Sequence, residues 1–240
     1  MMKQILTKDG STTFYSEEAK DNYHTLAGGM EEAFEKHARA LNIKEKENPV
    51  IFDICFGLGY SAAAAIEEIK IDSENKKNNK KITIYCFEND KKIIREILNI
   101  NSPAACKESF EIIKSFAKKF LEQKKDKFKY EETKIIDERT IKIKLTIKLI
   151  MIFGDARKTI KKIKENADFV FFAPFSPAKV PELWTKEFFK DINSKMNSEG
   201  KLSTYSYAKF VRENLKNAGF ILHDGPILGR RSPSTIAIKK

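Results

Sequence analysis

The chain has 240 residues, enough for one large hydrophobic core and small for two independent domains. It carries 45 Lys and Arg against 34 Asp and Glu, and the formal net charge of +11 favours a polyanionic partner such as nucleic acid. No apolar run approaches about 18 residues, and the N-terminus lacks the apolar core of a signal peptide. We therefore predict no membrane span and expect a cytoplasmic protein. The alternative explanation of the charge is an AT-rich or heat-adapted genome, which raises the content of lysine and isoleucine.

Taken in chain order, residues 4–16 alternate weakly between apolar and polar and predict a small hairpin with its turn at Asp9-Gly10. Residues 17–41 have a helical pattern that is broken at Gly28-Gly29. A polar linker then leads to the first apolar strand. We expect an N-terminal extension at residues 1–48 and a larger domain at residues 49–240. The three cysteines lack the spacing of metal ligands, so no metal is expected.

Strands and helices alternate through the larger domain. The predicted strands are 49–54, 82–87, 134–153, 168–173, 201–206, 220–223 and 234–239, and the predicted helices are 60–70, 90–98, 107–122, 156–164, 181–196 and 207–218. Such alternation predicts one mostly parallel sheet with helices on both faces, which is a Rossmann-like α/β fold.

The segment 134–153 differs from the other predicted strands. Isoleucine and leucine alternate with polar residues from Ile141 onward, which predicts a half-buried strand whose Lys142, Lys144 and Lys148 share one face. Residues 137–139 are expected to turn a hairpin onto this strand. The three lysines form a basic stripe that suits RNA, as does, less strongly, the lysine run 114–129.

The most informative stretch is VIFDICFGLG at residues 50–59. An apolar strand ends at Asp53, Gly57 and Gly59 form a turn, and a helix of small residues follows. A buried strand that feeds a glycine turn and a helix N-terminus is typical of a nucleotide-type site in an open α/β sheet. The glycines are expected to let the backbone approach a ligand closely.

Acids lie at the ends of three successive strands: Asp53, Glu88 and Asp155. The carboxyl ends of strands line the ligand crevice in such sheets. An acid after the second strand suits ribose hydroxyls, and one after the third suits the amine of adenine. The turn also matches the dinucleotide fingerprint. However, Asp53 would repel a diphosphate and attract the cationic methionine part of S-adenosylmethionine, so we favour S-adenosylmethionine over NAD.

The C-terminal half resembles the methyltransferase domain of the MnmC family. The resemblance rests on the loop FSPAKVPELW at 175–184, the strand LSTYSYA at 202–208 and GRR at 229–231, together with N-terminal pieces such as GST at 10–12 and GGMEE at 28–32. Members methylate the 5-aminomethyl group of a wobble uridine, with or without 2-thiolation, in tRNA. The FAD-dependent oxidase domain fused in some relatives has no counterpart here, so the resemblance implies a stand-alone methyltransferase.

The resemblance implies a role for each matching position. The cofactor-binding residues would be Asp53, Phe56, Gly57, Gly59, Glu88, Asp155, Ala156 and Glu32. The catalytic positions would be Ala173, Phe175 and Tyr205, and substrate or tRNA would contact Pro174, Ser176, Trp184, Arg230 and Arg231. The anticodon stem-loop would be held through its phosphates by a basic surface, and the protein would act as a monomer without metal or membrane. Packing against the sheet is the alternative role for Trp184.

One position departs from the family. The residue before Pro174 is usually Asp, and here it is Ala173. A lost hydrogen bond to a charged partner costs about 1.5–3 kcal/mol, or roughly ten- to a hundred-fold in rate. The backbone carbonyl of Ala173, Tyr205 or Glu32 would then hold the amine.

We therefore predict an S-adenosylmethionine-dependent tRNA methyltransferase. The alternatives are a tRNA-binding protein with an impaired site, an aminopropyltransferase of the same fold and an NAD-linked oxidoreductase.

Overall fold

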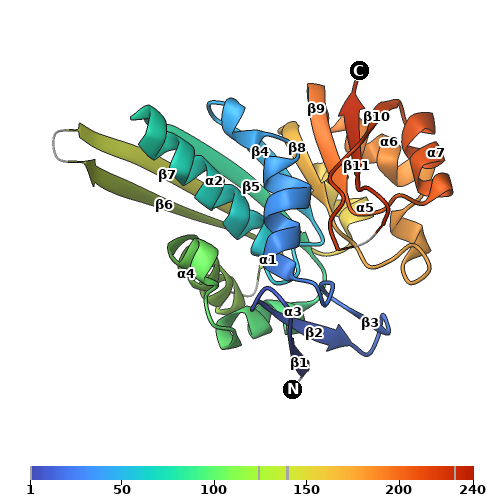
Figure 1. Cartoon of the computed structure of the whole chain (residues 1–240), viewed down its shortest axis with the longest axis horizontal. Coiled ribbons are helices and arrows are strands. Elements are labelled where there is room, and N and C mark those ends of the chain that lie inside the picture. Colours follow the sequence, from blue (N-terminus) through green and yellow to red (C-terminus); the bar gives the residue numbers. More distant parts are fainter. Residues whose placement is uncertain (1, 124, 139–140, 230) are drawn as a thin grey trace.

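The computed structural model describes residues 2–123, 125–138, 141–229 and 231–240. A three-stranded antiparallel sheet, in the order β1-β2-β3, precedes an eight-stranded sheet in the order β10-β11-β9-β8-β4-β5-β7-β6. Figure 1 shows helices on both faces of the large sheet. The prediction of a Rossmann-like α/β fold with a small N-terminal extension is confirmed.

The bounds of the elements are as follows. The strands are β1 (Lys3–Leu6), β2 (Thr12–Ser16), β3 (Asp21–Asn22), β4 (Val50–Ile54), β5 (Lys80–Glu88), β6 (Lys127–Glu138), β7 (Ile141–Phe153), β8 (Ala167–Phe172), β9 (Met196–Thr204), β10 (Phe220–Asp224) and β11 (Thr235–Lys239). The α-helices are α1 (Gly29–Glu32), α2 (Tyr60–Lys76), α3 (Lys91–Glu96), α4 (Lys107–Leu121), α5 (Ala156–Thr159), α6 (Lys186–Ser194) and α7 (Lys209–Asn217). The short helices are η1 (Ala33–Arg39, a π-helix), η2 (Ile43–Glu45), η3 (Ile97–Asn99), η4 (Ala104–Cys106), η5 (Ile160–Lys162) and η6 (Pro181–Leu183).

The large sheet separates two apolar layers because successive strand residues point to opposite faces. Ile51 of β4 faces the layer formed with α1, α2 and α4, whereas Phe52 faces the layer formed with α5, α6 and α7. Both residues are fully buried. The central strands are therefore apolar on both faces, as a parallel sheet between two helical layers requires.

The sheet reverses its direction of growth between β4 and β8. β4 pairs in parallel with β5, which pairs with β7, and the chain then returns to place β8 on the other side of β4 and β9 beyond it. At such a reversal the connections leave in opposite directions and open a crevice at the carboxyl ends of the strands. This geometry places Asp53, Glu88, Asp155 and Ala173 at one edge of the sheet.

The predicted strand 134–153 is part of a long antiparallel hairpin, β6–β7, in which Phe128 pairs with Met151 and Ile136 with Ile143. Its end projects beyond the helices in Figure 1. The prediction did not include the first half of β6, where Glu131, Glu132 and several lysines obscure the alternation. The predicted turn residue Arg139 lies outside the described residues.

The N-terminal prediction was partly wrong. Residues 17–27 contain turns and the short strand β3, and helix begins only at Gly29. Asp9, at the predicted hairpin turn, accepts hydrogen bonds from the N–H groups of Met30 (3.0 Å) and Glu31 (2.9 Å), which fixes the start of α1. Tyr60 donates to the carbonyl of Thr12 (2.7 Å) and joins this extension to α2. Within the part of the chain described, no helix is long and apolar enough to cross a membrane.

Candidate active site

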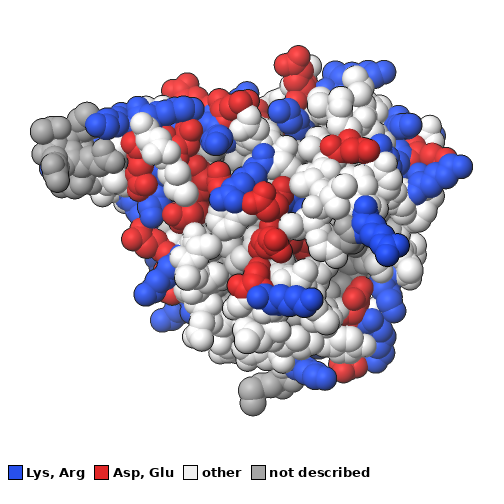
Figure 2. Space-filling model, viewed as in Figure 1, with Lys and Arg blue, Asp and Glu red and all other residues white. Residues whose placement is uncertain are grey.

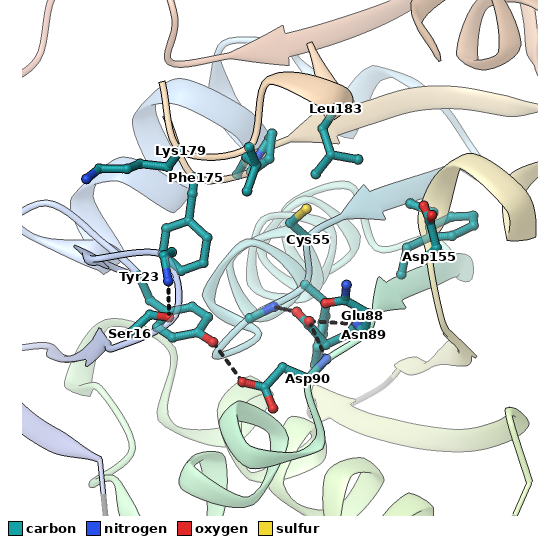
Figure 3. A pocket seen from close by; sticks show the side chains of 18 of the residues that line it. Ser16, Tyr23, Cys55, Glu88, Asn89, Asp90, Asp155, Phe175, Lys179 and Leu183 are labelled. Carbon is teal, nitrogen blue, oxygen red and sulfur yellow. Dashed lines mark hydrogen bonds between the residues drawn. The ribbon is translucent and has the colours of Figure 1, made fainter. Parts of the chain in front are cut away.

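A cavity of about 350 Å³ opens at the carboxyl ends of β4, β5, β7 and β8. Its walls include Phe56 and Gly57 after β4, Glu88 at the end of β5, Asp155 after β7 and Ala173 after β8 (Figure 3). The N-terminal extension closes the remaining side. The cavity therefore lies where the order of the strands predicts a ligand.

The glycine turn is shaped by packing as much as by space for a ligand. Gly59 has φ +76°, and a methyl group there would lie 2.6 Å from Ile113 of α4 and 2.8 Å from Phe56. Gly57 has φ +54°, and a methyl group there would lie 3.7 Å from Tyr23 and 3.8 Å from the Cys55 carbonyl, which are ordinary contact distances. Gly59 therefore lets α2 pack against α4, whereas Gly57 lines the cavity and adopts a left-handed conformation. That both glycines bind the cofactor stays a prediction.

Glu88 connects the turn to the end of β5. Its Oε2 accepts the N–H of Gly57 (2.8 Å), and its Oε1 accepts the N–H groups of Asn89 (2.8 Å) and Asp90 (3.0 Å) (Figure 3). Burial raises the pKa of Glu88, and these three donors offset part of that rise. A carboxylate has about four acceptor positions, so Glu88 keeps capacity for a hydroxyl group of a ligand in the cavity.

Asp155 follows β7, the strand next to β5, and its carboxylate already has partners within the protein. It caps α5 by accepting the N–H of Arg157 (3.0 Å), and the Arg157 guanidinium also contacts both of its carboxylate oxygens. The hydrogen bond from the Arg157 side chain lowers the pKa of Asp155, so this group is ionised at neutral pH. Ala156 follows it and contributes an apolar surface to the cavity.

Asp53 lies below the cavity surface, with only 1% of the residue exposed. Its Oδ2 has no hydrogen-bond partner among the described residues. Burial and the nearby charge of Glu88 hold the pKa of Asp53 well above its usual range. A buried carboxyl group without a partner is costly in the free protein, and a cation brought into the cavity would favour its ionised form.

The mouth of the cavity is framed by two aromatic rings. Tyr23 of the extension and Phe175 of the loop after β8 lie edge to face, with centroids 4.8 Å apart. Tyr23 donates to Asp90 (3.1 Å) and is thereby tied to the end of β5 (Figure 3). The loop at 174–184 and the extension therefore meet across the opening.

Trp184 does not contact this opening. It is 1% exposed, packs edge-on against Phe172 and Tyr205, and donates its Nε1–H to the carbonyl of Phe175 (3.0 Å). The hypothesis that Trp184 stacks on a nucleobase is wrong for this arrangement, because its ring faces are covered by the core. Its hydrogen bond instead positions the loop that carries Phe175.

The remaining predicted residues are divided between the cavity and its surroundings. Ala173 and Pro174 line the cavity, and Tyr205 supports it by donating to the Pro174 carbonyl (3.0 Å). The Ser176 carbonyl accepts the N–H of Lys179 (2.8 Å) and stabilises the loop, and Arg231 is exposed. Arg230 lies outside the described residues.

Glu32 is not among the described residues that line the cavity. It is buried and forms an ion pair of 2.8 Å with Lys36, one turn further along the chain. Burial would raise the pKa of Glu32, but the charge and hydrogen bond of Lys36 outweigh it and lower that pKa. A direct contact between Glu32 and a ligand in the cavity would require this ion pair to open.

Several cavity residues carry no assigned role from the sequence, among them Tyr23, Cys55 and Lys179. Cys55 lies in the turn with φ +68° and lines the cavity. The sequence feature that could have indicated a cavity position for Cys55 is that it lies between Asp53 and Gly57. Nothing in a single sequence brings Tyr23 to Phe175, because that contact joins segments far apart in the chain.

The residues present fit S-adenosylmethionine. Glu88 supplies an acceptor for ribose hydroxyls, Asp155 supplies one for the adenine amine, and Asp53 supplies an uncompensated buried carboxyl near the glycine turn. The cavity offers no comparable site for a diphosphate, because the residues around the turn are acids.

Comparison with known proteins supports this assignment. A family model described as S-adenosyl-L-methionine-dependent methyltransferase matches residues 112–240, more than half of the chain. The chain belongs to this family. The protein is therefore an S-adenosylmethionine-dependent methyltransferase.

Individual relatives show which kind of methyltransferase this chain resembles. The crystal structure of MnmC2 from Aquifex aeolicus superposes with a TM-score of 0.76 at 29% identity, covering 99% of this chain and 70% of that one. An uncharacterized protein of Methanocaldococcus jannaschii is 29% identical over 98% of this chain, which spans 59% of that protein. The tRNA 5-methylaminomethyl-2-thiouridine biosynthesis bifunctional protein MnmC of Campylobacter hominis is 36% identical over 36% of this chain and 13% of its own length. The predicted resemblance to the MnmC methyltransferase domain is confirmed.

Proposed function

We propose that the protein methylates the aminomethyl nitrogen of 5-aminomethyluridine, with or without 2-thiolation, at the wobble position of tRNA. The observation that carries this proposal is the framed mouth of the cofactor cavity, where Phe175 of the MnmC-like loop meets Tyr23. Ala173 and Pro174 line the same cavity, so an extended aminomethyl group that enters beside the two rings would reach them while the base remains outside.

The residues of the chain would act by binding and positioning. Glu88, Asp155, Ala156, Phe56 and Gly57 would hold S-adenosylmethionine, which supplies an electrophilic methyl group, and Asp53 would favour its cationic methionine part. Transfer forms a bond between the nitrogen and the methyl carbon, and the electron pair of the broken carbon–sulfur bond remains on sulfur.

The attacking amine must be neutral, and a partly desolvated cavity favours that form because burial disfavours an ammonium. Orientation is the main contribution that the protein makes to a direct displacement. We propose that the backbone carbonyl of Ala173 accepts a hydrogen bond from the amine. Ala173 lies at the end of β8, where its N–H donates to the carbonyl of Ile54 (3.3 Å) and so fixes the peptide.

Ala173 also motivates a second candidate, a tRNA-binding protein whose transfer activity is impaired. The two candidates differ in one experiment, the transfer of labelled methyl from S-adenosylmethionine to tRNA bearing 5-aminomethyluridine. The proposed enzyme turns over with Ala173 in place. The impaired protein binds tRNA and cofactor but transfers methyl only after Ala173→Asp restores an acidic side chain.

A further inference from the structure

The β6–β7 hairpin has two chemically different faces. Alternate residues such as Tyr130, Leu145 and Leu149 are buried beneath α2 and α4. The residues between them point to the other side of the sheet. We call this second side the basic face and define it by four lysines with two threonines between them. They are Lys127, Lys129, Thr133, Lys144, Thr146 and Lys148.

Several lysines on the α2 and α4 side form ion pairs with acids. Lys70 contacts Glu67 and Glu108, and Lys134 also contacts Glu108 (3.7 Å). Figure 2 views the molecule from this side and shows blue and red side chains interspersed.

The basic face is less well compensated. Lys129 pairs with Glu131 (3.2 Å). Glu165 is a second acid close by: a hydrogen bond from Tyr85 lowers the pKa of Glu165, and the charges of Lys127 and Lys148 lower it further. Lys144 and Lys148 have no ion pair within the described part of the chain. The lysines here exceed the described acids.

The positive charge continues from the hairpin toward the cavity. The segment α5–η5 packs on the same side of the sheet through Ile160 and adds exposed Lys158, Lys162 and Lys164. It begins at Ala156, and both Ala156 and Arg157 lie on the cavity wall. A strand rises about 3.4 Å per residue, so the path from Lys144 to the cavity end of β7 at Phe153 is about 31 Å long.

We propose that the basic face binds the phosphate backbone of an RNA helix whose modified nucleotide occupies the cavity. This inference rests on the proposed RNA substrate. Exposed lysines with interspersed threonine hydroxyls suit phosphate oxygens, which accept from both groups without reading sequence. The lysines of the basic face lead toward the cavity, so an RNA helix bound along them would present one of its ends to the cavity.

Protection of an edge strand is the other role that lysines play in such a place. β6 is the last strand of the sheet, and charged side chains discourage pairing with another copy. That role predicts aggregation when the lysines are removed and no change in RNA affinity.

The test is the affinity for an unmodified tRNA transcript between 50 and 300 mM salt, measured by fluorescence anisotropy. The test variant carries Lys129→Gln, Lys144→Gln and Lys148→Gln. We expect the slope of log affinity against log salt to fall by about 2, since each phosphate contact contributes about 0.7–0.9. The same change corresponds to roughly 10- to 100-fold weaker binding at 0.15 M salt.

The matched control removes three lysines from α4 with Lys107→Gln, Lys114→Gln and Lys118→Gln, so both variants lose the same charge. We expect the control to retain the slope and affinity of the natural protein. Equal losses in both variants, unchanged binding by the hairpin variant, or no tRNA binding by the natural protein would each overturn the inference.

A second readout separates this inference from the proposed function. Methyl transfer to the free nucleoside 5-aminomethyluridine involves no helix, so the hairpin variant should keep its kcat/KM on the nucleoside and lose it on tRNA. If the hairpin variant methylates tRNA as well as the natural protein does, the inference fails and the proposed function stands. If the natural protein methylates neither substrate, the proposed function fails, and the binding experiment still decides the inference because it requires no turnover.

Discussion

Asp53→Asn tests the buried acid beneath the glycine turn. Asn has the same shape and, like Asp, leaves a buried polar atom without a partner, so the substitution isolates the effect of charge. The carboxyl group is 1% exposed, its Oδ2 is unpartnered, and its pKa is raised by burial and by Glu88. We expect the variant to be a more stable free protein that binds the cofactor less tightly.

The stability change has a defined sign and pH window. A carboxyl whose pKa is raised on folding binds more protons in the folded state, so stability falls as pH rises above the unfolded value of about 3.9. Each unit of rise costs about 1.4 kcal/mol at higher pH. At pH 8 the variant should therefore be more stable than the natural protein and unfold at a higher temperature. The gain should vanish near pH 4.

Cofactor affinity should change in the opposite direction. Opposite charges about 4 Å apart at an effective dielectric constant of 20 attract by about 4 kcal/mol, which is an upper limit for the lost interaction. We expect a dissociation constant about 10- to 100-fold higher by isothermal titration calorimetry at pH 8. Unchanged affinity, or a stability difference that is equal at pH 4 and pH 8, would refute the role assigned to this acid.

Three further substitutions test the cavity and its supports. Glu88→Gln should weaken cofactor binding at least about ten-fold and lower stability, because the amide has only one oxygen to accept the N–H groups that now donate to both carboxylate oxygens. Glu182→Gln is the control. Equal cofactor affinities of the Glu88→Gln and Glu182→Gln variants would contradict the role of Glu88 in binding ribose. Gly59→Ala should lower the free energy of unfolding by about 2–4 kcal/mol in chemical denaturation, since the added methyl group meets α4 and the left-handed backbone strains any residue other than glycine. A decrease of less than about 0.5 kcal/mol would show that the turn adapts. Trp184→Phe removes the hydrogen bond to the Phe175 carbonyl and should raise KM for tRNA several-fold while the cofactor dissociation constant stays the same; a change confined to the cofactor would contradict the positioning role.

The glycine turn and the strand-end acids could be predicted because they follow from local patterns. The run ending at Asp53 marks a buried strand, and Glu88 and Asp155 end apolar runs of the same kind. Once the strands are parallel, their carboxyl ends must meet at one edge. The fold class and the position of the cavity therefore required no knowledge of distant contacts.

Other features depended on tertiary contacts that a pattern does not record. Residues 17–27 look helical, yet they pack as turns and β3 because the extension must reach across the cavity to Asp90. Trp184 is apolar with a polar edge, and only its neighbours show that it lies in the core. Gly59 was assigned to ligand approach, although the group that requires its missing side chain is Ile113, more than fifty residues away in sequence.

The most direct test of the account is methyl transfer by the natural chain to tRNA bearing 5-aminomethyluridine, with Ala173→Asp measured in parallel. The account predicts incorporation of labelled methyl with Ala173 in place, and none into tRNA that lacks the aminomethyl group. The Ala173→Asp variant should differ in rate by no more than about 100-fold, the size of one charged hydrogen bond. Transfer only by the Ala173→Asp variant would mean that the natural chain is the impaired binding protein. Cofactor binding without transfer by either protein would contradict the proposed substrate.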